Sequence, residues 1–187
     1  MATDSLEIFV RQIRERSREN AQSLLLLHRE NLQANVVSIL RQELDSLVRV
    51  IFLLSQTERA YRNTLIADSV EGRQWTKKGG KGRITDREMV DLSKDLFNWA
   101  KNVYEFGCAF IHLSSFHDYA TRDPLEKVST GERATIASYL NYYHLVHLGP
   151  DVRFSEILPL LPRVFEKISS NLECYLKKLE ENGDLSD

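Results

Sequence analysis

Residues 85–115 read TDREMVDLSKDLFNWAKNVYEFGCAFIHLSS, and this stretch has the most regular hydrophobic pattern in the chain. Its apolar residues recur every three or four positions: Met89, Leu92, Leu96, Trp99, Val103, Phe106, Phe110 and Leu113. That spacing predicts a helix from Asp86 to about Ser115, about 45 Å long, with a seam suited to packing against another helix. Thr85 and Glu88 provide a capping box at its start, and Gly107 marks a point for a bend.

Helical spacing of apolar residues continues on both sides of this stretch. It predicts further helices over about 6–27, 37–54, 58–70, 130–146 and 159–180. No convincing strand pattern and no internal repeat is found. The sequence therefore predicts an all-α, up-and-down helical bundle of about five or six helices, as a single domain over residues 1–187. The polar tail, 184–187, is expected to fray.

Composition restricts the class of protein. The 187 residues carry a formal net charge of -2, which argues against general coating of nucleic acid. The first nine residues lack a secretion-signal pattern, and no apolar run approaches the roughly 20 residues of a membrane helix. Cys108 and Cys174 are far apart and are interpreted as reduced core thiols, with a disulfide as the alternative. We therefore expect a cytoplasmic protein with no membrane partner.

Residues 73–84 form the clearest break in the helical pattern. Three glycines within four residues disfavour a helix there and predict a flexible loop. Its substrate-binding candidates are Lys77, Lys78, Lys81 and Arg83, because flexible cations release counterions when they bind a nucleic-acid backbone. Trp75 is a candidate for stacking on a base. The alternative is a solvated connector without a ligand.

Residues 104–118 combine apolar side chains with an acid, a thiol and two histidines. Glu105 and His112 are seven positions apart, which places them on one face of the predicted helix. His112 is a candidate general acid or base, because imidazole titrates near physiological pH. The alternative is a histidine satisfied inside the bundle, with Glu105 at its rim.

Metal binding has weaker support in the sequence. His112, His117 and Asp118 would need a turn to bring them together, and His144 and His147 share a helical face without an evident third ligand. The chain contains no Glu-x-x-His motif of the kind that holds a di-metal centre in helical bundles. No metal site and no cofactor is therefore predicted, although a metal-dependent hydrolase remains an alternative.

A charge ladder marks the helix predicted over 37–54. Arg41, Asp45 and Arg49 are spaced four residues apart and so stack on one face. Such ladders usually face solvent, where each pair contributes only about 0.3–0.5 kcal/mol. The alternative is that this ladder lines the interface with the helix predicted from Asp86.

Two blocks of the chain, within roughly residues 20–120, resemble the HEPN superfamily, in particular its abortive-infection members. The first is LRQELD at 40–45 followed by the leucine-rich run to Leu54, and the second is YEFGCAFIH at 104–112. The resemblance implies a helical bundle that is often a homodimer, with a cleft at the dimer interface. Active members are metal-independent ribonucleases in which an Arg holds the phosphate and a His moves protons.

This resemblance assigns roles to individual residues. It implies His112 as the acid–base residue, Arg41 and Arg49 as phosphate-holding cations, and the basic loop as an RNA clamp. Glu105 occupies the position of the expected Arg, and a carboxylate there repels phosphate and raises the pKa of a nearby imidazole. The resemblance thus implies a protein that acts on or binds RNA, its active form being a metal-independent ribonuclease of a defence or toxin system. A non-enzymatic module that dimerises through the seam is the alternative.

Overall fold

The computed structural model describes residues 4–80, 82–93, 96, 99–112 and 114–185. It confirms the predicted all-α helical bundle, with seven α-helices of eight or more residues in the described ranges. These are α1 (Ser5–Arg29), α2 (Gln33–Leu54), α3 (Arg59–Val70), α4 (Asp86–Ser93), α5 (Ala100–Ile111), α6 (Thr130–His144) and α8 (Leu161–Glu180); α7 (Phe154–Ile157) is a single turn. None of the helices described is long and apolar enough to cross a membrane.

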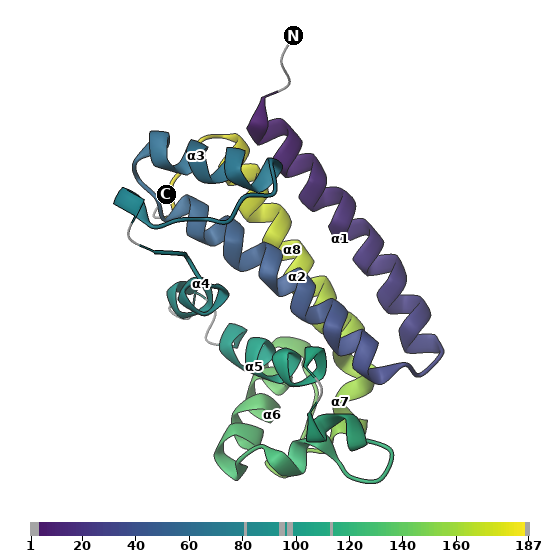
Figure 1. Ribbon diagram of the computed structural model, residues 1–187. Helices are drawn as coiled ribbons and strands as arrows, with labels where there is room; N and C mark the ends of the chain where they lie inside the picture. The colour runs from purple at the N-terminus through teal and green to yellow at the C-terminus, as the bar shows by residue number, and fades with distance from the viewer. Residues whose placement is uncertain (1–3, 81, 94–95, 97–98, 113, 186–187) are drawn as a thin grey trace.

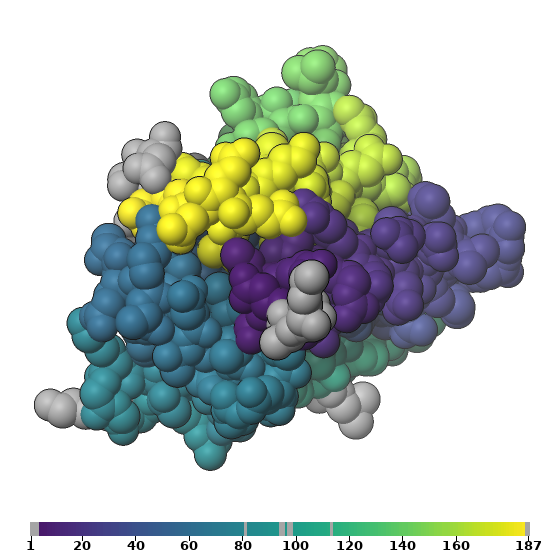
Figure 2. All heavy atoms as spheres, turned by 90° about the horizontal axis from the view of Figure 1, so that it is seen from above, coloured from purple at the N-terminus to yellow at the C-terminus, as the bar shows by residue number. Residues whose placement is uncertain are grey.

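The three longest helices, α1, α2 and α8, lie side by side (Figure 1), and Figure 2 shows α8 along α1 from a second direction. Helix α1 runs antiparallel to α8, because Arg14 pairs with Glu173 at 2.8 Å and His28 contacts the carbonyl of Leu158 at 3.0 Å. Helices α2 and α8 run parallel to each other, because their C-terminal ends meet: the amide of Leu185, just past α8, donates to the carbonyl of Leu54 at the end of α2 (Figure 1). Helices α5 to α7 form a second group at the end of α2 where that helix begins.

Helix α2 is the centre of the fold. Thirteen of its 22 residues are buried, and α1, α4, α5 and α8 all pack against it. Three of the buried residues are polar, so each requires a partner. Glu43, with no exposed surface, accepts hydrogen bonds from the Ser17 hydroxyl at 2.5 Å and the Asn20 amide at 3.0 Å, both on α1.

The prediction of one helix from Asp86 to Ser115 is wrong, because the chain forms α4 and α5 as separate helices (Figure 1). The hydroxyl of Ser93 donates to the carbonyl of Val90, and the amide of Leu96 donates to the carbonyl of Ser93 in a tight turn. The second bond spans three residues instead of the four of an α-helix, and α4 ends at Ser93. Helices α4 and α5 each pack an apolar face against α2, at different positions along its length.

The prediction of a frayed C-terminal tail is also wrong for residues 184 and 185. Arg62, only 1% exposed, pairs with Asp184 at 2.6 Å. The amide of Leu185 donates to the carbonyl of Leu54. The tail therefore closes over the end of α2, held by a buried cation; residues 186 and 187 lie outside the described ranges.

Candidate functional site

The two residues proposed for catalysis, Glu105 and His112, are both exposed. Glu105 pairs with Lys101 one turn away, at 3.7 Å. His112 follows the last residue of α5, and its extended backbone (φ -95°, ψ 139°) takes the chain away from the helix. Among the described residues, the His112 side chain has no hydrogen-bond or ion-pair partner. Within the described part of the chain, no arginine or lysine is therefore hydrogen-bonded to this histidine.

The charge ladder on α2 lines a helix interface, which was the alternative to a solvated face. Asp86, the first residue of α4, contacts Arg49 at 3.1 Å and Arg41 at 3.4 Å. Asp45 contacts Arg49 at 3.0 Å and Arg41 at 3.9 Å. Two carboxylates thus hold two guanidinium groups in one network between α2 and α4.

Arg41 is the buried member of this network, with 6% of its surface exposed. Its guanidinium lies 4.1 Å from the centre of the Tyr104 ring on α5. Burial lowers the pKa of Arg41, but the side chain of Cys108 and the carboxylates of Asp45 and Asp86 outweigh burial and leave the pKa raised. Arg41 is therefore a cation held by the fold, with little surface to offer a ligand.

Residues 73–84, whose flexibility stays a prediction, fold back as a hairpin in the part that the structure describes. Thr76 and Arg83 make an isolated antiparallel bridge, and the amide of Ile84 donates to the carbonyl of Trp75. Gly79, Gly80 and Gly82 all have positive φ, so the glycines serve a tight turn. Trp75 is buried, donates its indole N–H to the Ser69 hydroxyl at 2.9 Å, and packs on Phe52, which leaves no ring face for a base.

The cations of this hairpin differ in their partners. Lys77 pairs with Glu88, and Lys78 pairs with Glu58. Arg83 is exposed, and its side chain makes no ion pair with any residue that the structure describes. Lys81 lies outside the described residues. Arg83 is therefore the hairpin cation best placed to meet a ligand.

Four arginines from three segments border one open cleft, which we call the arginine cleft: Arg16 on α1, Arg49 on α2, and Arg73 and Arg83 in the hairpin. Its volume is about 520 Å³, and Asp86 is the one carboxylate among its lining residues. Carboxylates behind the cleft pair with three of the four: Asp45 with Arg16 and Arg49, and Asp68 with Arg73. In the arginine cleft, ion pairs to carboxylates outside the lining thus hold guanidinium groups in position, and these groups face the open cleft.

Arg16 was not among the residues predicted from the sequence. Its Nη1 lies 3.4 Å from the hydroxyl of Ser46 and 3.7 Å from Asp45, both on α2. One signal was available, because Arg16 follows the buried Phe9 and Ile13 at helical spacing and so borders the face of α1 that packs on α2. That face was not predicted to lie beside the ladder of α2.

The histidines proposed for a metal site do not come together. His117 accepts a hydrogen bond from the backbone of Ser114 and caps a 3-10 turn, whereas His144 is buried and His147 is exposed. Burial, followed by the charges of Arg163 and Lys167, lowers the pKa of His144. In the described ranges, no three His, Cys, Asp or Glu side chains are grouped so as to hold a metal ion.

The two cysteines are both free. Cys108 is half-buried on α5 beside Arg41, while Cys174 is exposed on α8. The prediction of a core thiol is therefore wrong for Cys174, which lies on the solvent face of its helix. The alternative of a disulfide between them is also wrong.

Most of the seam predicted for dimerisation is used inside the chain. Met89, Trp99 and Phe110 are buried, and Val103 and Phe106 pack against the core. Leu92 and Leu96 remain exposed, whereas Leu113 lies outside the described residues. The homodimer stays a prediction.

Comparison with protein-family models, with curated proteins and with solved structures gives no match for this chain.

Proposed function

We propose that this chain is a HEPN-like helical protein that binds RNA through the phosphates of the backbone, in the arginine cleft. The observation that carries the proposal is the convergence of four arginines from α1, α2 and the hairpin on one open cleft of about 520 Å³. Guanidinium groups suit phosphate because they offer paired donors in a planar arrangement. A cleft of this volume lies within the usual range for ligand sites.

The ion pairs behind the cleft orient the arginines without using all their donors. Arg49 gives its Nε to Asp45 and its Nη2 to Asp86, which leaves its Nη1 for a ligand. Arg83 has no competing carboxylate in the described part of the chain. Phosphate must compete with the existing pairs, so we expect a dissociation constant of about 1–100 µM at physiological salt, as in non-specific binding.

The site favours RNA binding without metal-independent cleavage. The HEPN reaction needs a cation beside the histidine, and no cation is hydrogen-bonded to His112 among the described residues. Glu105, at the position of the expected arginine, pairs with Lys101. We therefore expect no cleavage in EDTA; cleavage by the wild type that is lost in His112→Ala would instead identify a ribonuclease.

The binding test is fluorescence anisotropy with a labelled single-stranded RNA. Arg16→Ala and Arg83→Ala should each weaken binding by about three- to tenfold and reduce the salt slope by about 0.7, the value for one lost phosphate contact on a single strand. Arg18→Ala is the matched control, because Arg18 is exposed on the same helix but lies outside the arginine cleft. Equal binding by all three variants would contradict the proposal, as would tighter binding of DNA than of RNA.

A further inference from the structure

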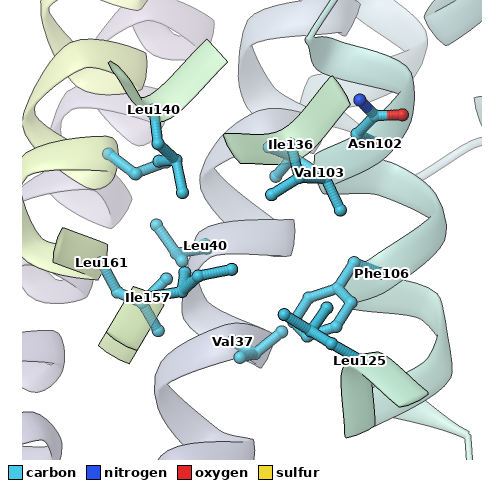
Figure 3. Close-up of a pocket in the computed structure, with 11 residues that line it drawn as sticks. Val37, Leu40, Asn102, Val103, Phe106, Leu125, Ile136, Leu140, Ile157 and Leu161 are labelled. Carbon is cyan, nitrogen blue, oxygen red and sulfur yellow. The ribbon is translucent and has the colours of Figure 1, made fainter. Parts of the chain in front are cut away.

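A second hollow lies between α2, α5, α6 and α8, away from the arginine cleft. Its inner part, of about 90 Å³, is lined by eleven residues, of which Asn102 is the one polar side chain. Figure 3 shows Leu40, Leu140 and Leu161 around a common space, with the amide of Asn102 at its edge. This hollow is the inner part of what we call the apolar cavity, and an adjoining hollow is its outer part.

The outer part, of about 70 Å³, adjoins the inner part. The two share five lining residues: Asn102, Val103, Ile136, Leu140 and Val164. Together they match the volume of an engineered apolar cavity of about 150 Å³, which stays dry and takes up benzene. Protein interiors normally leave few voids larger than a water molecule, so a hydrocarbon guest would restore contacts that the lining now lacks.

The lining of the outer part is as apolar as that of the inner part, but a lysine stands at its border. The outer part is bordered by Tyr139, Tyr143, His144 and Lys167. The Nζ of Lys167 lies 4.4 Å from the centre of the Tyr143 ring and has no carboxylate partner among the described residues. Burial and then the charges of Arg163 and Lys167 lower the pKa of His144, and the charge of Glu166 raises it. The apolar cavity therefore ends at a cationic group.

We propose that the apolar cavity binds a small aliphatic carboxylate, with a chain of about six carbons inside and the carboxylate at Lys167. The inner lining fits the hydrocarbon chain, because burying it there replaces water contacts by contacts with leucine, isoleucine and valine side chains. Lys167 supplies the charge complementary to the head group, and the Tyr143 ring holds the ammonium beside the outer part.

The helix that closes the cavity is suited to admit a guest. Only three of the fifteen residues of α6 are buried, namely Ala137, Leu140 and His144. Ile136 and Leu140 of this helix form one wall of both parts. Both parts are already partly open to solvent. An element with few buried contacts moves at low cost, so α6 is the helix that a guest would displace on entry.

Hexanoate is the probe for this proposal, measured by isothermal titration calorimetry on the full chain and by the fluorescence of Trp99, which borders the outer part. We expect a dissociation constant of about 0.1–1 mM, as for a ligand of this size. Hexanol, which has the same chain without the charge, should bind about tenfold more weakly. Equal affinity for hexanol would overturn the assignment of a carboxylate.

Two variants locate the binding site. Lys167→Met should weaken hexanoate binding about tenfold, whereas Lys177→Met, an exposed lysine on the same helix, should leave it unchanged. Ile136→Phe fills the space between the two parts and should abolish binding while the thermal unfolding transition is retained. Wild-type affinity in Lys167→Met, or in a folded Ile136→Phe protein, would overturn the proposal.

Discussion

Arg41 illustrates how a single side chain can look like a ligand-binding residue and serve the fold instead. It is a cation within a leucine-rich helix, which suggested phosphate binding. In the structure its charge is matched by Asp45 and Asp86, and its guanidinium lies over the Tyr104 ring. Removing one partner of a buried ion pair typically costs about 3–5 kcal/mol, because the other charge is left unpaired. Arg41 is therefore a residue that the α2–α4–α5 contact requires.

His144 gives the stability of the protein a dependence on pH. Its pKa is lowered by burial and then by Arg163 and Lys167, so the folded state binds a proton less readily than the unfolded chain, whose histidine titrates at about 6.5. The contribution of neutral His144 is complete above that pH and is lost as the pH falls below it. We expect urea unfolding to show a smaller loss of stability between pH 7.5 and pH 5.5 in His144→Gln than in the wild type.

The control for this prediction is His147→Gln, which removes an exposed histidine three residues away. It should retain the pH dependence of the wild type. An identical loss of stability in His144→Gln and in the wild type would show that other groups account for the acid sensitivity.

At the scale of elements, the contact between α2 and α5 depends on Gly107. A Cβ added there would lie 2.7 Å from the Cβ of Arg41, closer than carbon atoms approach in proteins. Gly107→Ala gains about 1 kcal/mol of helix propensity, but overpacking costs about 1–3 kcal/mol. Because Arg41 is held by two carboxylates and cannot withdraw easily, we expect a net loss of stability of up to about 2 kcal/mol in urea unfolding.

Gly131→Ala is the matched control for Gly107→Ala. Gly131 lies in the first turn of α6, is exposed, and has no atom within 4 Å of an added Cβ. This substitution should leave the stability unchanged or raise it slightly. If Gly107→Ala stabilised the protein as much as Gly131→Ala does, the tight approach of α5 to α2 would be contradicted.

The helices and the hairpin show which structural features could be predicted from the sequence. Apolar periodicity predicted most of the buried positions among the described residues of 86–111, although Leu92 and Leu96 are exposed. It could not locate the turn at Leu96, because both short helices satisfy the same period. The glycines of the hairpin predicted a flexible loop, but they could not predict the contact of the Trp75 indole with Ser69. Local patterns thus predicted helices and faces, whereas tertiary contacts determined where elements end.

Sites depend on contacts between distant segments, which a single sequence does not reveal. Arg16 meets Asp45 across two helices, and Arg62 meets Asp184 across 122 residues. Of the predicted cations, Arg49 and Arg83 line the arginine cleft and Arg41 pairs with Asp86 at its border, while their role in binding stays a prediction. Their grouping could not be predicted, because it follows from the packing of α1 and α4 on α2.

At the scale of the whole molecule, the two groups of helices differ in how firmly they are buried. Helix α2 buries 13 of its 22 residues, whereas α6 buries three of 15 and borders the apolar cavity. Segments with few buried contacts open locally at a lower free energy than the core. We therefore expect native-state hydrogen exchange to show lower protection for the amides of α6 than for those of α2.

The same experiment links this difference to the proposed ligand. Saturating hexanoate stabilises only states in which the apolar cavity is closed, so it should slow exchange in α6 and at its contacts with α5, while α3, which lies at the other end of α2, keeps its exchange rate (Figure 1). A ligand bound elsewhere would not slow the hydrogen exchange of α6 more than that of other helices. Equal protection of α6 and α2 without ligand would contradict the independent opening of α6, because it would mean that both helices exchange only when the whole bundle unfolds.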